Sequence, residues 1–281
     1  MKNKAVRRSL QILSVGLTLL TFVFAYGYGR TLLADVDFTQ LNAVWLVLSG
    51  VGFILFYGCF SFHWAKIARL IDATASPLQP LAFCASQPYK YLPTSIFTFS
   101  FRAKYAKELG MSVKNSSYAQ LLENINILAS GIFVAATGAL LYVHILSGVL
   151  LMVFVLFLSL IIWRQKFVWR APYFKRIIPI YKMIPVIGIM ILAWLCGGLA
   201  FWAANAALGF SPDVRLAIAA NAAGYVASIL AFFAPGGIGV REWVLATFSI
   251  ASMPILLWRM ITFIGDVVIG FSAIVVIKRV K

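Results

Sequence analysis

Long apolar runs dominate this 281-residue sequence and restrict the folds that are open to it. Hydrophobic residues make up 62% of the chain and charged residues 11%, whereas soluble domains average about 45–50% and about 25%. An apolar run of about 20 residues crosses a bilayer as a helix. We therefore expect an all-α polytopic membrane protein. Its six transmembrane helices are predicted at residues 10–28, 41–62, 121–142, 149–163, 183–207 and 255–277.

The basic residues predict the orientation of these helices. The net charge is +16, and most of the 24 Lys and Arg residues lie in short segments between alternate runs. Because Lys and Arg are enriched in cytoplasmic loops, we expect a multi-pass protein of the cell (inner) membrane with both termini in the cytoplasm. Charge spread over short loops favours contact with anionic lipid headgroups over nucleic-acid binding. The basic segments are residues 2–8, 66–69, 102–114, 164–182 and 278–281.

Two further apolar segments contain residues that break helices. Residues 78–101 carry Pro88, Lys90 and Pro93 and have basic residues on both flanks. A single crossing would place one basic flank outside, so we predict a re-entrant hairpin that opens on the cytoplasmic side. Residues 217–251 contain the sequence APGGIGVRE and are predicted to form a second hairpin that opens on the outer side. Broken backbone in a bilayer is tolerated only where protein or a water-filled cavity surrounds it.

The order of these segments is the same in both halves of the sequence. Span, span, hairpin and span occur within residues 1–143 and again within residues 146–281. The two hairpins open on opposite sides, so the halves are predicted to form an inverted repeat. In transporters, interrupted segments at matching positions of inverted repeats mark the substrate site.

Three stretches of the chain resemble a known family. KYLPTSIFTFSFRAKYAKELGMS, LLENINI and PGGIGVRE together are similar to the transmembrane region of lysylphosphatidylglycerol synthases, a flippase-like family of integral membrane proteins. The Lys-Tyr-x-Pro-Gly element of that family, followed by an Arg, matches Lys90, Tyr91, Pro93 and Arg102. Its Gly-x-Gly-x-x-Glu element matches the second break at Pro235, Gly237, Gly239, Arg241 and Glu242.

The resemblance implies transport of a lipid across the bilayer. Some members of that family are fused to aminoacyl-transferase or glycosyltransferase domains, and we expect this chain to be the bare membrane module. Thr94 stands where a glycine is usual, so the first hairpin is expected to be less sharply broken or to admit a different headgroup.

Arg241 and Glu242 are the first candidate site residues. A half-helix that begins at Val240 would point its free N–H groups at the break, where an Arg binds phosphate bidentately. The alternative is that both side chains reach the outer interface and the glycines only form a turn. Lys90 is the counterpart in the first hairpin, or else a residue that reaches the interface beside its tyrosines. We expect Arg102 mainly to report topology.

Arg259 and Asp266 lie two helical turns apart and therefore face the same way. They are expected to pair with each other, to pair with Arg241 and Glu242, or to line a polar path. Glu123 and Asn126 share one helix face, and we expect them to be cap and interface residues rather than a polar wall.

These observations favour a lipid transporter that moves the headgroup of a phospholipid or polyprenyl-phosphate-linked lipid, with Arg241 and Lys90 near opposite mouths of a polar cleft. The alternative is a non-catalytic membrane partner of a separate synthase or glycosyltransferase, docked through residues 164–182. An enzyme is not expected, because the sequence shows no nucleophile elbow or metal motif. No metal and no cofactor is predicted, and the three cysteines are expected to be free.

Overall fold

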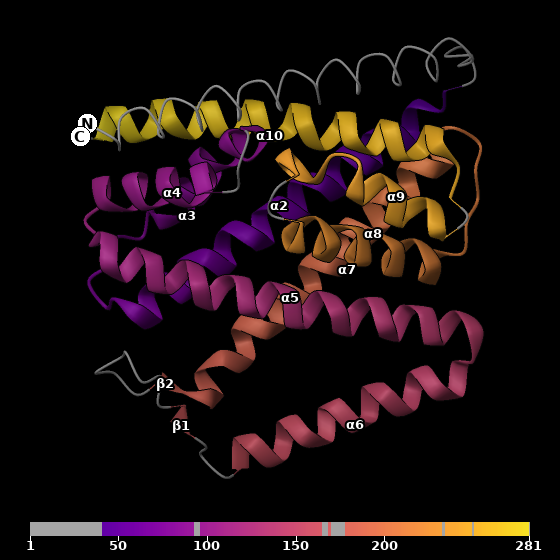
Figure 1. Cartoon of the computed structure of the whole chain (residues 1–281), viewed down its shortest axis with the longest axis horizontal. Coiled ribbons are helices and arrows are strands. Elements are labelled where there is room, and N and C mark those ends of the chain that lie inside the picture. The colour runs from indigo at the N-terminus through magenta and orange to yellow at the C-terminus, as the bar shows by residue number, and fades with distance from the viewer. Residues whose placement is uncertain are drawn as a thin grey trace, which may run out of the picture.

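The computed structural model describes residues 41–92, 96–164, 168–169, 178–231, 234–248 and 250–280. This part of the chain is almost entirely helical (Figure 1). Four helices are long and apolar enough to cross a membrane, which makes the chain a multi-pass membrane protein. They are α2 (Ala43–Ile71), α5 (Val113–Val143), α7 (Ile184–Ala207) and α10 (Ser252–Val280). They contain four of the predicted spans, and the first predicted span, residues 10–28, lies outside the described residues.

The remaining long helix, α6 (Ile145–Arg164), covers the fourth predicted span. It follows α5 after the single residue His144. A short antiparallel pair, β1 (Val168–Trp169) and β2 (Ile178–Pro179), comes next. The 3-10 helix η3 (Ile180–Met183) then leads into α7. Most of the predicted docking loop at residues 164–182 lies outside the described residues.

Polar side chains start several of these helices. The side chain of Asn42 accepts hydrogen bonds from the backbone N–H groups of Val44 and Trp45 at the start of α2. Ser112 caps α5 in the same way. Such caps satisfy N–H groups that have no partner within the helix.

Each interrupted segment forms two helices joined by a 3-10 turn. The first consists of α3 (Gln79–Ser86), η2 (Gln87–Tyr91) and α4 (Ile96–Glu108). The second consists of α8 (Val214–Leu230), η4 (Pro235–Gly237) and α9 (Val240–Thr247). In each segment the two helices pack against each other. Pro93 lies outside the described residues.

The helices pack in a reciprocal pattern. α2 packs against α7, which is the most extensive helix contact between the described halves. α5 packs against α8, the first arm of the second interrupted segment, and α10 packs against α3, the first arm of the first one. The last helix of each half therefore lies against the interrupted segment of the other half.

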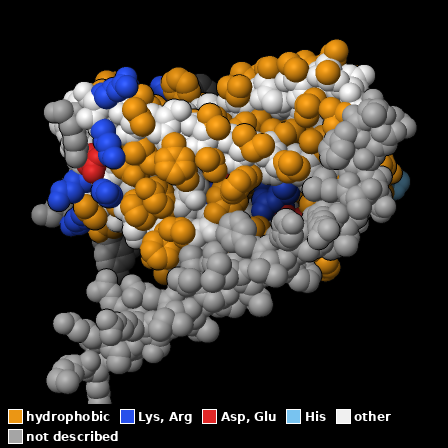
Figure 2. Space-filling model, turned by 90° about the horizontal axis from the view of Figure 1, so that it is seen from above, with side chains coloured by type: hydrophobic (Ala, Val, Ile, Leu, Met, Phe, Trp, Pro, Cys, Tyr) orange, Lys and Arg blue, Asp and Glu red, His pale blue; other side chains and the backbone are white. Residues whose placement is uncertain are grey.

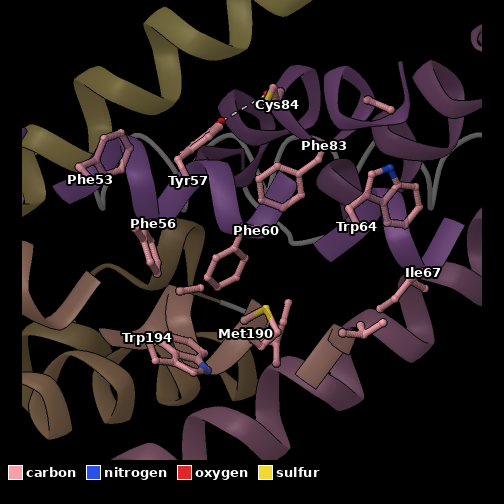
Figure 3. Close-up of a cluster of buried hydrophobic side chains, with 14 of the residues drawn as sticks. Phe53, Phe56, Tyr57, Phe60, Trp64, Ile67, Phe83, Cys84, Met190 and Trp194 are labelled. Carbon is pink, nitrogen blue, oxygen red and sulfur yellow. Dashed lines mark hydrogen bonds between the residues drawn. The ribbon is translucent and has the colours of Figure 1, made fainter. Parts of the chain in front are cut away.

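Aromatic and small residues fill the centre of the molecule. Phe56 and Phe60 of α2 point toward Trp194 of α7 at the base of the cluster, and Phe83 of α3 lies beside Phe60 (Figure 3). Small residues allow the closest approaches, because a Cβ at Gly198 would come within 2.6 Å of Ile218 Cα. Such contacts between small residues hold membrane helices together.

The two ends of the molecule differ in charge. On a largely apolar face, one basic group lies in a hollow near the middle, and further Lys and Arg side chains gather at one end (Figure 2). α2, α4 and α10 end there and α5 begins there (Figure 1). We refer to this as the basic end. It includes Lys66 and Arg69 of α2, Lys104 and Lys107 of α4, Lys114 of α5, and Lys278 and Arg279 of α10.

Candidate functional site

A cavity of about 340 Å³ lies where the two interrupted segments meet. Its walls come from both of these segments and from α2, α5 and α10. Four cationic side chains line it, and within the described part of the chain no Asp or Glu does. Aromatic and aliphatic side chains such as Phe60, Phe83 and Ile127 form much of the remaining wall. The four cations are Lys90, Arg102, Arg241 and Arg259.

The tips of the two interrupted segments touch at this cavity. Gly236 in η4 has φ +57°. Residues that carry a Cβ disfavour this backbone angle, whereas glycine adopts it readily. A Cβ at that position would come within 2.8 Å of the ring of Tyr91 in η2. The breaks in the two halves therefore form one structural unit, and Gly236 allows the close approach.

Lys90 and Tyr91 in η2 both contact Asp266 of α10. Lys90 Nζ lies 2.6 Å from Asp266 Oδ2, and the Tyr91 hydroxyl donates to the same oxygen at 2.7 Å. The Asp266 side chain is 2% exposed. The ion pair of Lys90 therefore ties the first interrupted segment to the last helix of the other half.

Arg102 and Glu123 form a buried ion pair between α4 and α5. Arg102 also donates from Nε to Ser86 Oγ at 3.0 Å, and its guanidinium lies 4.7 Å from the centre of the Phe83 ring. Arg102 therefore does more than report topology, and Glu123 is buried rather than placed at an interface as expected. α4 folds back along α5, so the two side chains meet inside the protein, where neither is more than 6% exposed.

Glu242 and Arg259 link α9 to α10. Arg259 Nε lies 2.6 Å from Glu242 Oε1, and Arg259 Nη2 donates to the carbonyl of Gly236 at 3.0 Å. The other carboxylate oxygen of Glu242 accepts a hydrogen bond from the Gly239 N–H at 2.6 Å. The half-helix α9 begins at Val240 as predicted. Arg259 and Asp266 take different partners rather than pairing with each other.

Arg241 lies close to these pairs and has no carboxylate partner in the described part of the chain. Its Nη2 donates to Asn221 Oδ1 at 2.9 Å, and its guanidinium lies 5.4 Å from the centre of the Tyr225 ring. Its Nε has no hydrogen-bond partner. Arg241 is 4% exposed. A buried charge without a counter-charge is costly, so this position favours an anion.

The structure thus gathers most of the candidate residues around one cavity. Lys90 and Arg241 line the same cavity, whereas they were expected near opposite mouths. Pro235 and Gly239 flank the second break, and Gly237 lines the cavity. Gly237 also has a positive φ of +69°.

Asn221 and Tyr225 of α8 were missed by the sequence analysis. Asn221 Oδ1 accepts from both Arg241 and the indole of Trp258, the latter at 3.1 Å. Asn221 stands alone among small apolar residues of α8, and an amide within an apolar helix was the available signal.

Another ion pair lies away from the cavity, at the end of the molecule opposite the basic end. Arg215 Nη2 lies 2.6 Å from Asp213 Oδ2, and Arg215 also donates to the carbonyl of Leu141. The hydrogen bond from the Arg215 side chain lowers the pKa of Asp213 to about 2. Both side chains are partly exposed, so this pair provides a comparison for the buried ones.

The described residues contain no group of three or more His, Cys, Asp or Glu side chains arranged to hold a metal ion. Cys59, Cys84 and Cys196 are free thiols. Comparisons of the chain with protein families, with curated proteins and with solved structures find no match.

Proposed function

We propose that this protein is a flippase-like lipid transporter of the inner membrane. It moves the anionic headgroup of a phospholipid or a polyprenyl-phosphate-linked lipid between leaflets, while the lipid tails stay in the bilayer. The observation that carries the proposal is the cavity that four cations and, among the described residues, no carboxylate line, and in which Arg241 has no counter-charge from those residues.

The charge balance of the site supports an anionic cargo. Glu123, Asp266 and Glu242 each pair with one of the other cations from behind the cavity wall. The charge of Arg241 is left over, and a phosphate diester with a single negative charge would balance it. Because Glu242 occupies the N–H at the start of α9, the Arg241 guanidinium rather than the helix terminus is the main donor to that phosphate.

The packing pattern supports the full topology that we propose. In this topology six spans surround two re-entrant hairpins, α3–α4 and α8–α9, and residues 1–143 and 146–281 form an inverted repeat. The pairing of α5 with α8 mirrors that of α10 with α3. The ion pairs follow the same order, because α4 binds α5 through Arg102 and α9 binds α10 through Glu242.

In the proposed mechanism the two halves rock about the contact between the hairpin tips and alternate access to the cavity. In this proposal the basic end faces the cytoplasm, the side on which the basic segments of the sequence also predict both termini. A membrane potential of 100 mV, negative inside, drives one negative charge outward by about 2.3 kcal/mol. An anionic headgroup therefore moves outward without a further energy source.

The test is leaflet exchange in liposomes that contain the purified protein. Fluorescently labelled phosphatidylglycerol and a labelled polyprenyl phosphate are the probes. We expect exchange with the wild type and loss of exchange with Arg241→Ala. Arg215→Ala removes an Arg outside the cavity and is the matched control, so it is expected to transport normally.

Each other outcome identifies a different function. If the folded wild type moves neither lipid, the transporter proposal fails. The better-supported function is then that of a non-catalytic partner of a separate synthase or glycosyltransferase. If Arg241→Ala transports as fast as the wild type, the cavity is not the site. Chemical change of the lipid during the assay would indicate an enzyme instead.

A further inference from the structure

A second hollow, of about 680 Å³, lies between α4 and α5. Lys104 and Lys107 of α4 line one wall, and the first half of α5 forms the other. Both lysines belong to the basic end. We name this hollow the α4–α5 groove.

A polar strip leads from this groove to the central cavity. Ser117 and Gln120 line the groove, and Asn124 lines the cavity. The three residues are spaced three and four apart, so they lie on one face of α5. Gln120 is 3% exposed, and its Oε1 has no hydrogen-bond partner. A buried amide oxygen without a partner keeps an unused acceptor on this strip.

Phe99 is the point where the groove and the cavity meet. Its side chain contributes to the walls of both. The neighbouring residue Thr98 lines the cavity, and its hydroxyl has no partner in the described structure. A headgroup that passes Phe99 would leave the lysines of the groove and reach Arg102 and Arg241 in the cavity.

We propose that the α4–α5 groove binds the phosphate of membrane phospholipids in the leaflet at the basic end and delivers them to the cavity past Phe99. This proposal rests on the proposed function, because it names the route by which the cargo reaches the same site. Lys104 and Lys107 attract the phosphate, the strip on α5 solvates the headgroup, and the Phe99 ring separates the groove from the cavity.

The charge of the groove favours a lipid phosphate as the occupant. Each Lys or Arg near an anionic leaflet strengthens attraction to it. Lys107 also lies in the last turn of α4, where a cation stabilises the helix end. Stabilising the end of α4 requires neither the groove nor the polar strip. A lipid between α4 and α5 is therefore expected only if the lysines also bind its phosphate.

The test uses the full chain in nanodiscs of phosphatidylcholine that contain phosphatidylglycerol with a diazirine on its headgroup. After illumination, peptide mass spectrometry locates the labelled residues. We expect label within residues 96–124 in the wild type. A diacylglycerol that carries the same diazirine but no phosphate should not label this region. Equal labelling by both probes would overturn the assignment of a phosphate site.

Variants separate the groove from general surface charge. The double variant Lys104→Gln with Lys107→Gln is expected to lower labelling and the initial transport rate about 25-fold, since each of the two basic residues contributes a factor of about five. Lys104→Arg with Lys107→Arg should retain both. Lys66→Gln with Arg69→Gln removes the same charge from the basic end outside the groove and should lower both much less, because neither side chain lines the groove.

Phe99 provides an independent measurement. Phe99→Trp enlarges the barrier and is expected to slow transport several-fold while groove labelling persists. Phe99→Ala removes the ring and should transport at least as fast as the wild type. If both substitutions slow transport equally, Phe99 is a packing residue and the proposed route past it is wrong.

The outcomes also distinguish this inference from the proposed function. Arg241→Ala should abolish transport and keep groove labelling, which supports the groove as a separate site. Lysine-dependent labelling in a wild type that transports no lipid would support headgroup binding in the groove and overturn the proposed function. Normal transport by the Lys104→Gln and Lys107→Gln variant would overturn the groove proposal and leave the proposed function standing.

Discussion

The four cations around the cavity are not equivalent as single residues. Three of them form an ion pair with a carboxylate. Arg241 instead donates a hydrogen bond to Asn221 and lies over the face of the Tyr225 ring. Removal of one partner from a buried ion pair leaves an uncompensated charge, whereas removal of an unpaired buried charge takes away a desolvation cost. The two kinds of substitution should therefore change stability in opposite directions.

We predict that Asp266→Asn destabilises the protein and that Arg241→Met does not. Asp266→Asn leaves Lys90 without its counter-charge. Because the Lys90 side chain is 24% exposed, we expect a cost near the lower end of about 3–5 kcal/mol. Arg241→Met keeps an unbranched chain in the same space, and Asn221 Oδ1 retains the Trp258 donor. The thermal unfolding midpoint in detergent should fall for the first variant and stay level or rise for the second.

A second substitution checks the physical cause. Lys90→Met added to Asp266→Asn removes the stranded charge, so the double variant should be more stable than Asp266→Asn alone. Equal midpoints for the single and double variants would show that the pair contributes nothing measurable. A large loss of stability in Arg241→Met would mean that Arg241 has a structural role that its contacts do not show.

At the scale of elements, the sequence predicts where helices lie better than what they face. Apolar runs gave α2, α5, α7 and α10 close to their observed positions, and Gly239 marked the start of α9 at Val240. Glu123 was misjudged because its place along α5 says nothing about which helix covers it. α4 does so only after the chain reverses at η2, and no local pattern encodes that contact.

The contact between η2 and η4 is the element-scale feature that sequence alone does not predict. Three glycines in the second break have positive φ, but only one of them meets the other half of the molecule. Gly236 lies against Tyr91, whereas a Cβ at Gly239 would find no atom within 4 Å. Substitutions at these two glycines can therefore distinguish the effect of backbone strain from the effect of the contact between the tips.

We predict that Gly236→Ala lowers both stability and transport more than Gly239→Ala. Both substitutions place a side chain at positive φ, which costs about 1 kcal/mol or more. Gly236→Ala in addition brings a methyl group within 2.8 Å of the Tyr91 ring, so the tips must separate. Unfolding midpoints and leaflet-exchange rates of the two variants measure the difference. Tyr91→Leu in the Gly236→Ala background should recover part of the loss, and equal defects would show that only backbone strain matters.

At the scale of the whole molecule, the last helix of each half packs against the interrupted segment of the other half. α5 packs against α8 of the second interrupted segment, and α10 packs against α3 of the first one. This reciprocity supports the proposed inverted repeat, in which the two hairpins enter from opposite sides. The ion pairs at the cavity link α4 to α5 and α9 to α10 within the halves, and the Lys90–Asp266 pair crosses between the halves.

The orientation of both hairpins can be measured with introduced cysteines. Cys59, Cys84 and Cys196 are first replaced, since they are free thiols. Single cysteines are then placed on the flanks of each interrupted segment, at Ala73 and Lys114 for the first and at Ser211 and Ser252 for the second. All four positions are exposed. A membrane-impermeant maleimide is applied to cells and to inverted membrane vesicles.

We predict that Ala73→Cys and Lys114→Cys react only in inverted vesicles, because both flanks of α3–α4 lie at the basic end. Ser211→Cys and Ser252→Cys should react only in cells. If the first segment crossed the bilayer once, Ala73→Cys and Lys114→Cys would react from opposite sides. That result would remove the inverted repeat, since the last helices of the two halves would no longer run in opposite directions. If both flanks of the first segment react from one side and both flanks of the second from the other, the two hairpin tips enter the membrane from opposite sides. Alternating access to one cavity requires this geometry.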